Sequence, residues 1–327
     1  MGPPLKVGMI GARRIRQGLG PYIARDLHAH GAEVSLVLGR TQKSAEDAAQ
    51  EIGETAGGRP RATSDRASFF AADLDVICVL TPKGTHGPFV EASLNAGRHV
   101  LCEKPLFWHP ETGDWAAAAR DLEDRFAAKG LVFGINAQWP WTVPAFEELH
   151  GPLQDLPRTL SMGLTPASNG REMIGDAAPH PLSLAQALRP DLERLVSVAF
   201  EGRGPSDIDF TAVLEGEHGP FEIHAELRGS GAPPPREAWF AIDGKRVDRC
   251  IRTSDYALFL RDGARVVDLP DPLGLRIAAF LGDARAAEEA GRPVRTPDRT
   301  ASRRAGMLSA LDSAFDSTFG PAFAGGD

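Results

Sequence analysis

The sequence has little cysteine, no long apolar run and no excess of basic residues. Its three cysteines, Cys78, Cys102 and Cys250, form no Cys-x-x-Cys pair, which favours a reducing compartment over a disulfide scaffold. No apolar run approaches membrane-spanning length, and the first residues lack a secretory signal pattern. The formal net charge of -8 argues against a general binder of nucleic acid or membrane surfaces. We therefore expect a cytoplasmic protein with no nucleic-acid or membrane partner.

Signatures of several enzyme classes are also missing. There is no Gly-x-Ser-x-Gly elbow and no Walker phosphate loop. His28 and His30 are two residues apart on a predicted helix end, so they do not share a face, and we expect no metal site. At 327 residues, however, the chain is long enough for two domains with separate cores.

Short apolar runs alternate with helical patterns through the first 135 residues. The runs are nearly continuous in apolar character, as expected of parallel strands buried on both faces. They cover residues 7–10, 34–38, 76–80, 99–102 and 131–135, with helical patterns at 15–27, 44–52, 87–96 and 112–128. Repeated βα units of this length predict an α/β domain over 1–135, a doubly wound parallel sheet of the Rossmann type.

After about Trp141 the pattern changes to a series of strands, many with alternating polarity. Turn signals such as Asp243-Gly244 and Asp262-Gly263 separate several of them. The predicted strands are 158–164, 195–201, 207–214, 221–227, 238–242, 247–251 and 256–260, followed by helices at 273–289 and 300–315. We predict a second α+β domain over 136–327, built on a largely antiparallel open sheet. Its C-terminal helices can pack back on the first domain.

Two of the three glycines of a dinucleotide fingerprint are absent. An apolar strand runs into Gly11 and then into a helical pattern, the context in which a GxGxxG loop presents N–H groups to a pyrophosphate. Arg13 and Arg16 occupy the second and third glycine places and add bulk where the usual geometry needs close approach. Arginines here can still serve the pyrophosphate through charge-assisted bonds. Gly11, Arg13, Arg14 and Ile15 are therefore candidate cofactor residues.

The run Gly39-Arg40-Thr41-Gln42-Lys43-Ser44 follows the second predicted strand. An acidic residue at this place would bond the ribose hydroxyls of NAD, whereas an arginine can pair with the 2′-phosphate of NADP. Arg40 and Lys43 therefore favour NADP as the cofactor, with NAD as the alternative. The structural alternative is a solvated basic turn in which Ser44 caps the next helix.

Two later strands run into polar loops at their carboxyl ends, where open α/β sheets bind ligands. One ends in Thr81-Pro82 and continues to His86, and the other ends in Glu103-Lys104-Pro105. A lysine at this edge can be a catalytic acid, because burial beside a cofactor lowers its pKa. Taken alone, Lys104 is also what a solvated loop lysine looks like.

His180 is a second candidate for proton transfer. Imidazole exchanges a proton near neutral pH, as no other unperturbed side chain does. Pro179 and Pro181 flank it, which predicts a position near a helix N-terminus. Asp176 can orient the histidine or hold a substrate hydroxyl, or can serve merely as the cap of that helix. The segment 136–141, with Trp139 and Trp141, fits a pocket wall and core packing equally well.

In order and spacing, these elements resemble the Gfo/Idh/MocA family of oxidoreductases. The matched motifs are Thr81-Pro82 with His86, the run from Arg98 to Pro105, and Asp176-Ala177-Ala178-Pro179-His180. The resemblance implies a catalytic set of Lys104, Asp176 and His180. It also implies a nicotinamide-side set that includes Lys104 together with Thr81, Pro82, His86 and Glu103.

The resemblance further implies hydride transfer between a nicotinamide ring and a carbon bearing a hydroxyl, on a small sugar- or cyclitol-like substrate. The leading hypothesis is thus an NADP-preferring oxidoreductase. The alternative is a degenerate family member without nicotinamide turnover, acting as a binding or regulatory subunit or as a lyase or isomerase, motivated by Arg13 and Arg16. Because a sheet covered by helices on one face leaves the other face open, we also expect a homodimer or larger assembly.

Overall fold

The computed structural model describes residues 3–13, 18–109, 113–231, 238–252, 254 and 256–323. The chain forms two compact units. The first comprises the chain up to residue 113 together with 117–136 and 273–301, and the second comprises 114–116, 137–272 and the chain from 302 onward. Nearly all of helix α9 (Pro272–Glu289) therefore belongs to the first unit, although it follows the strands of the second unit in sequence. The sequence alone left open whether the C-terminal helices pack on the first domain.

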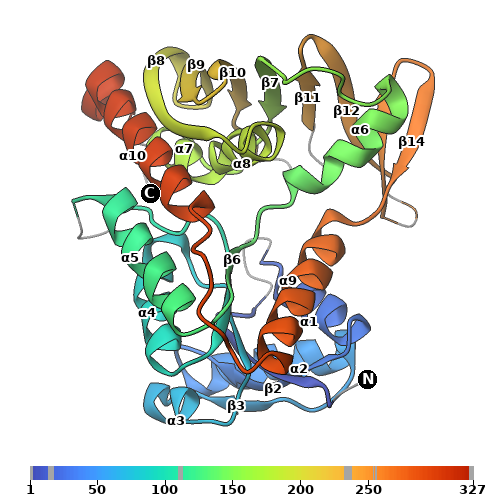
Figure 1. Ribbon diagram of the computed structural model, residues 1–327, viewed down its shortest axis with the longest axis vertical. Coiled ribbons are helices and arrows are strands. Elements are labelled where there is room, and N and C mark those ends of the chain that lie inside the picture. Colours follow the sequence, from blue (N-terminus) through green and yellow to red (C-terminus); the bar gives the residue numbers. More distant parts are fainter. Residues whose placement is uncertain are drawn as a thin grey trace. The chain divides into compact units, whose positions relative to one another are not determined.

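The first unit is built on a parallel six-stranded sheet in the order β3-β2-β1-β4-β5-β6 (Figure 1). Its strands are β1 (Leu5–Ile10), β2 (Ala32–Leu38), β3 (Arg61–Thr63), β4 (Val76–Val79), β5 (His99–Cys102) and β6 (Phe133–Ile135). All four residues of β4 and of β5 are buried, which explains their unbroken apolar character. The doubly wound parallel sheet predicted from the sequence is confirmed.

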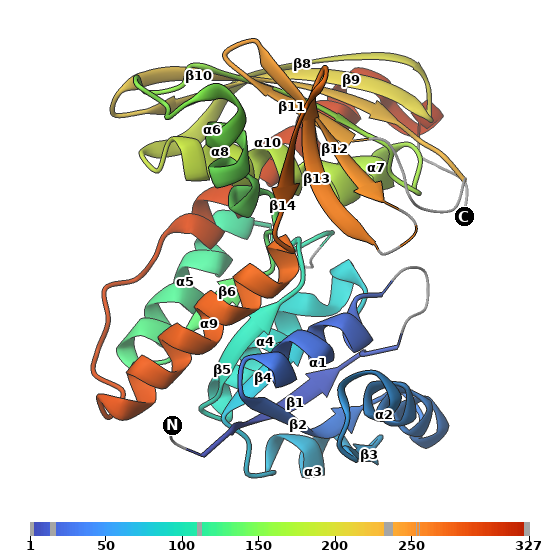
Figure 2. The same cartoon turned by 90° about the vertical axis from the view of Figure 1, so that its right-hand side faces the viewer.

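Helices cover both faces of this sheet (Figure 2). They are α1 (Gly20–Ala29), α2 (Gln42–Ala56), α3 (Arg66–Phe70), α4 (His86–Asn95), the 3₁₀ turn η1 (Lys83–Thr85), α5 (Trp115–Ala128) and α9. Side chains of α1, α2 and α9 share one apolar core with β1, in which Val7 and Ile277 are fully buried. On the other face, Phe126 of α5 stacks on Phe133 of β6 with 4.9 Å between ring centroids.

The second unit is built on an eight-stranded sheet in the order β14-β13-β12-β11-β7-β10-β9-β8. Its strands are β7 (Thr159–Leu164), β8 (Leu192–Gly204), β9 (Asp207–Gly216), β10 (Gly219–Arg228), β11 (Ala238–Ile242), β12 (Lys245–Arg252), β13 (Ala257–Asp262) and β14 (Arg265–Leu269). Only the β7–β10 pair is parallel among these described strands, so the largely antiparallel sheet is confirmed.

Helices pack on one face of the second sheet (Figure 2). They are α6 (Val143–His150), α7 (Arg171–Ala177), α8 (Pro179–Leu188) and α10 (Thr300–Phe319), with 3₁₀ turns η2 (Trp139–Thr142) and η3 (Gly320–Phe323). Phe146 of α6 lies on Phe240 of β11, and Phe315 of α10 lies on Phe200 of β8, with ring centroids 5.6 and 5.5 Å apart. Residues of β10 alternate between buried and more exposed, because the sheet has one face on the core.

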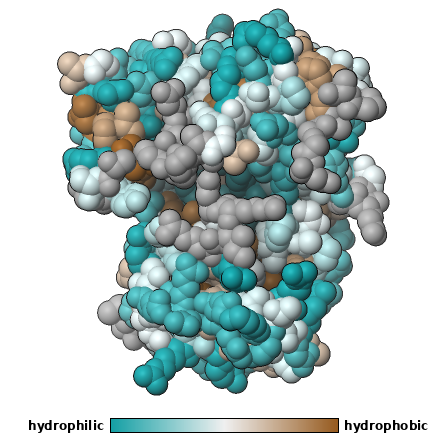
Figure 3. All heavy atoms as spheres, turned by 180° about the vertical axis from the view of Figure 1, so that it is seen from behind, coloured by the Kyte–Doolittle hydropathy of each residue, from teal (hydrophilic) through white to brown (hydrophobic). Residues whose placement is uncertain are grey.

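The surface in Figure 3 is dominated by hydrophilic residues, with smaller hydrophobic areas between them. Large hydrophobic side chains that are exposed in the described chain are scattered singly along the sequence: Leu156, Val196, Tyr256, Val266 and Val294. In the part of the chain that the structure describes, none of the helices combines the length and the apolar character needed to cross a bilayer.

Candidate active site

The carboxyl ends of the parallel strands bring most of the predicted site residues of the first unit to one edge of its sheet. Gly11 follows β1, Arg40 follows β2 after one glycine, and Thr81 follows β4 after one leucine. Glu103 follows β5 directly, and Asn136 follows β6. The chain reverses its direction of winding between β1 and β4, which is the switch point at which such sheets bind ligands.

Gly11 is the fingerprint glycine that the chain retains, and two constraints require it. Its φ of +75° lies in the left-handed region. A Cβ at this position would lie 2.8 Å from Cγ2 and 2.9 Å from Cα of Thr81. Gly11 therefore lets the loop after β1 touch the loop after β4, so two predicted cofactor residues are neighbours.

Helix α1 begins at Gly20 and not near Ile15, so the predicted helix start was wrong. Pro21 stands in the first turn, where its missing N–H is tolerated. A Cβ on Gly20 would lie 1.8 Å from the carbonyl oxygen of Ala12. Gly20 thus provides the close packing of helix against strand end that the third fingerprint glycine usually provides. The run Gly18-Leu19-Gly20-Pro21 is the sequence signal that could have revealed this.

Of the fingerprint residues after Gly11, Arg13 lies in the described chain, whereas Arg14, Ile15 and Arg16 lie outside the described residues. The Arg13 guanidinium is 3.7 Å from a carboxylate oxygen of Asp47 on α2. Lys43 also pairs with Asp47, at 3.0 Å. Two predicted cofactor residues, Arg13 and Lys43, therefore share Asp47 of α2 as their acidic partner.

Arg40 is exposed between the end of β2 and the start of α2. Its guanidinium makes no hydrogen bond or ion pair within the described part of the chain. The helix cap is Thr41 and not Ser44: the Thr41 hydroxyl accepts from the N–H of Ser44 at 3.1 Å, and the Ser44 hydroxyl accepts from the N–H of Thr41 at 3.0 Å. The turn is capped without Arg40 or Lys43, which leaves Arg40 available to a ligand.

His86 is buried beneath the loops that follow β4 and β5. Its two ring nitrogens lie 2.6 Å from the backbone oxygens of Thr81 and Pro105. Burial lowers the pKa of His86, and the two carbonyl contacts oppose that shift. In the neutral ring one of the two nitrogens carries a proton and donates to its carbonyl. His86 thus acts as a positioning residue that ties the two loops together.

Glu103, Lys104 and Asn136 form the polar group at the ends of β5 and β6. Asn136 is buried and donates from Nδ2 to Glu103 Oε1 at 2.6 Å. Burial raises the pKa of Glu103, whereas this hydrogen bond and the charge of Lys104 lower it. The Asn136 Oδ1 atom is buried and accepts no hydrogen bond from the described residues. A buried acceptor without a donor marks a position for a ligand group.

The two remaining predicted residues, Asp176 and His180, belong to the second unit. His180 is the second residue of α8, near its N-terminus, as expected. Asp176 lies inside α7 and does not cap α8, because Ala178 is the residue before that helix. The Asp176 carboxylate accepts a hydrogen bond from the hydroxyl of Ser168. Ser168 is a neighbour that the sequence did not indicate.

Trp139 of the aromatic segment is buried in the second unit. It is 7% exposed, and its ring centroid lies 5.9 Å from Phe240 and 6.0 Å from the His180 ring. Trp139 therefore packs in the core and also supports one face of His180.

The residues of the first unit fit a dinucleotide. The backbone at Gly11 comes so close to Thr81 that no side chain fits there, Arg40 is free of partners in the described chain, and Asn136 offers a buried acceptor.

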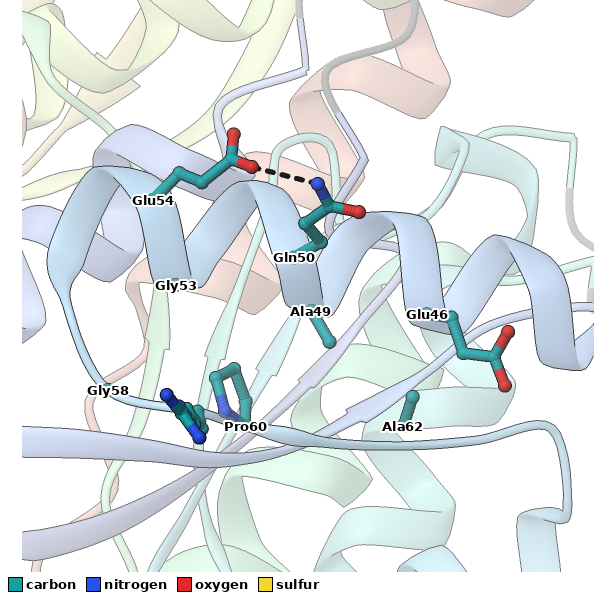
Figure 4. Close-up of a pocket in the computed structure, with 9 residues that line it drawn as sticks. Glu46, Ala49, Gln50, Gly53, Glu54, Gly58, Pro60 and Ala62 are labelled. Atoms are coloured by element: carbon teal, nitrogen blue, oxygen red, sulfur yellow. Dashed lines mark hydrogen bonds between the residues drawn. The ribbon is translucent and has the colours of Figure 1, made fainter.

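A groove of about 430 Å³ lies elsewhere, between α2 and the segment before β3, and none of the predicted site residues lines it (Figure 4). Its lining includes Gln50, which donates to Glu54 at 2.8 Å. In the described residues, no group of His, Cys, Asp or Glu side chains is arranged to hold a metal ion.

The sheet order and the glycine at its switch point are those of a Rossmann-type fold, in which dinucleotides bind at this edge of the sheet. The profile described as "Oxidoreductase family, NAD-binding Rossmann fold" matches residues 5–130. Over these residues the chain is similar to the Gfo/Idh/MocA oxidoreductase family.

Two curated relatives match over part of their length. One is an uncharacterized oxidoreductase, YfiI, of Bacillus subtilis, with 35% identity over 63 residues, 19% of this chain and 16% of the relative. The other is a dTDP-3,4-didehydro-2,6-dideoxy-alpha-D-glucose 3-reductase of Streptomyces violaceoruber, with 32% identity over 133 residues, 40% of this chain and 35% of the relative. The chain thus matches well under half of either.

Solved structures share the fold over nearly the whole chain. The UDP-N-acetylglucosamine 3-dehydrogenase GnnA of Acidithiobacillus ferrooxidans aligns with a TM-score of 0.66 and 23% identity, covering 98% of both chains. The 3-ketoreductase KijD10 of Actinomadura kijaniata, in complex with TDP-benzene and NADP, aligns with a TM-score of 0.63 and 20% identity, covering 94% of this chain and 96% of that one.

Proposed function

We propose that this protein is an NADP-preferring oxidoreductase that acts on a hydroxyl or carbonyl carbon of a small, polar, sugar- or cyclitol-like substrate. The observation that carries the proposal is the meeting of Gly11, Arg40 and Glu103-Lys104 at the carboxyl edge of one parallel sheet. The sugar-nucleotide reductase and dehydrogenase with similar sequence or fold support the substrate class.

Bound nicotinamide supplies the hydride chemistry, and the residues of the chain supply binding and proton transfer. Lys104, at the end of β5, donates or accepts the proton of the reacting oxygen. His180, the second residue of α8, is placed to exchange a proton with a substrate hydroxyl. Asp176 fixes a substrate hydroxyl or the histidine.

The loops of the first unit hold the dinucleotide. Gly11 admits the pyrophosphate to the end of β1, while Thr81 and Pro82 line the nicotinamide side. Arg40 pairs with the 2′-phosphate, since position 39 holds a glycine where an acidic residue would select NAD. Arg13 and Lys43, which both pair with Asp47 on α2, add positive charge to this part of the unit.

Titration calorimetry with NADPH and NADH tests the cofactor assignment. We expect NADPH to bind at least about tenfold more tightly, and Arg40→Ala to weaken NADPH by about 10- to 100-fold because it removes a charge-assisted bond. Arg120→Ala is the matched control, because Arg120 is an exposed arginine on α5. Equal affinity for NADH and NADPH, or an equal loss with Arg120→Ala, would show that Arg40 does not select the cofactor.

A further inference from the structure

Arg249 places a positive charge on the helix-covered face of the second sheet. It lies in β12, where side chains alternate between faces, so it shares its face with Val247. Across the strand pair it stands opposite Leu260 of β13. Val247 and Leu260 are both 0% exposed. Arg249 itself is half-buried beside these apolar side chains.

The same guanidinium is next to the proton-transfer candidate of this unit. Its Cζ lies 5.5 Å from the centroid of the Trp139 ring, and that ring lies 6.0 Å from the ring of His180. Arg249 and His180 thus both lie beside the Trp139 ring, and a ligand that contacts one is within reach of the other.

Arg249 has no hydrogen-bonded counterion in the described part of the chain. Burial lowers the pKa of Arg249, and the charge of Asp271 opposes that shift. A cation–π contact offsets only part of the cost of removing a guanidinium from water. Two other arginines of this unit are paired: Arg171 lies 2.7 Å from Asp312, and Arg189 lies 2.8 Å from Asp191. Arg249 therefore lacks the carboxylate partner that these two arginines have, and a bound anion would supply one.

We propose that Arg249 binds an anionic oxygen group of the substrate, a carboxylate or a phosphate, beside His180. The inference rests on the proposed function, because it takes the ligand to be the substrate of the same site. The planar guanidinium matches both groups through two parallel N–H bonds. The acid form of a sugar and a sugar phosphate are the two sources of such an anion.

Calorimetric titration with glucuronate, glucose 6-phosphate and neutral glucose tests the proposal and distinguishes the sources. We expect one of the charged sugars to bind more tightly than glucose, and Arg249→Gln to weaken it by about 10- to 100-fold with glucose unchanged. Arg249→Lys keeps the charge without the planar fork and should lose less.

Arg246→Gln is the matched control. Arg246 lies on the same strand and the opposite face, 4.2 Å over the ring of Trp239, and is ion-paired with Asp248 at 3.1 Å. An equal loss in Arg246→Gln, no loss in Arg249→Gln, or no preference for charged sugars overturns the proposal. NADPH titration of the same samples separates the two ideas, because nucleotide binding without anion binding rejects only the role of Arg249.

Discussion

Three glycine-to-alanine substitutions separate the two costs of adding a side chain at Gly11, the backbone conformation and the steric clash. Gly97 has a φ of +73° but nothing within 4 Å of an added Cβ, so it reports the backbone cost alone. Gly20 has no such φ, but its Cβ would meet Ala12 O at 1.8 Å, so it reports the steric cost alone. Gly11 combines a φ of +75° with a Cβ 2.9 Å from Thr81 Cα.

The expected losses in free energy of unfolding follow from these contacts. Gly97→Ala should cost about 1–2 kcal/mol for a left-handed alanine. Gly20→Ala should cost about 1–3 kcal/mol, because backbone must move to admit the methyl group. Gly11→Ala should cost the sum, about 2–5 kcal/mol. The gain from a stiffer unfolded chain, about 0.4–1 kcal/mol, is common to all three and cancels in the comparison.

Scanning calorimetry measures the losses, and hydrogen exchange of peptides from β1 and α1 assigns them to the first unit. The order of stability should be Gly97→Ala, then Gly20→Ala, then Gly11→Ala as the least stable. NADPH affinity should fall for Gly11→Ala and Gly20→Ala and stay unchanged for Gly97→Ala. If Gly20→Ala is as stable as the wild type and binds NADPH equally well, Gly20 does not take over the packing role of the missing glycine.

Further predictions concern chemistry, pH and assembly. Once a screen of polyols, sugars and keto compounds has identified a substrate, Lys104→Met should lower its turnover about 10²–10⁴-fold with NADPH affinity unchanged. Unchanged turnover in this variant would show that the active site lies elsewhere. Burial lowers the pKa of His86 and of His99 below the unfolded value, so the unfolded chain binds more protons and stability should fall as pH drops below about 6.5. Calorimetry from pH 7.5 to 5.5 should show a falling Tm, with a shallower slope for His99→Gln, and a flat profile would contradict this. The uncovered face of the second sheet should make the protein a homodimer or larger, and light scattering that gives a monomer at micromolar concentration would refute this.

The sequence pattern predicted well the strands and helices whose side chains are regularly buried. The interval 99–102 matches β5 residue for residue, because every side chain in it is buried. Turn pairs such as Asp243-Gly244 marked the hairpin between β11 and β12. The sequence missed β3 and β14, whose side chains are mostly exposed or half-buried, so their composition carries little pattern.

The sequence by itself determined the parallel sheet, the antiparallel sheet and the residues that follow their strands, because periodic burial is a local property of the chain. Only the tertiary structure decided which of those residues have partners. Asn136 meets Glu103 because β5 and β6 are neighbours, and Gly20 is required because α1 starts against Ala12. Arg249 lies over Trp139 because β12 and η2 meet within the second unit. Such contacts join residues far apart in sequence, so no spacing along the chain encodes them.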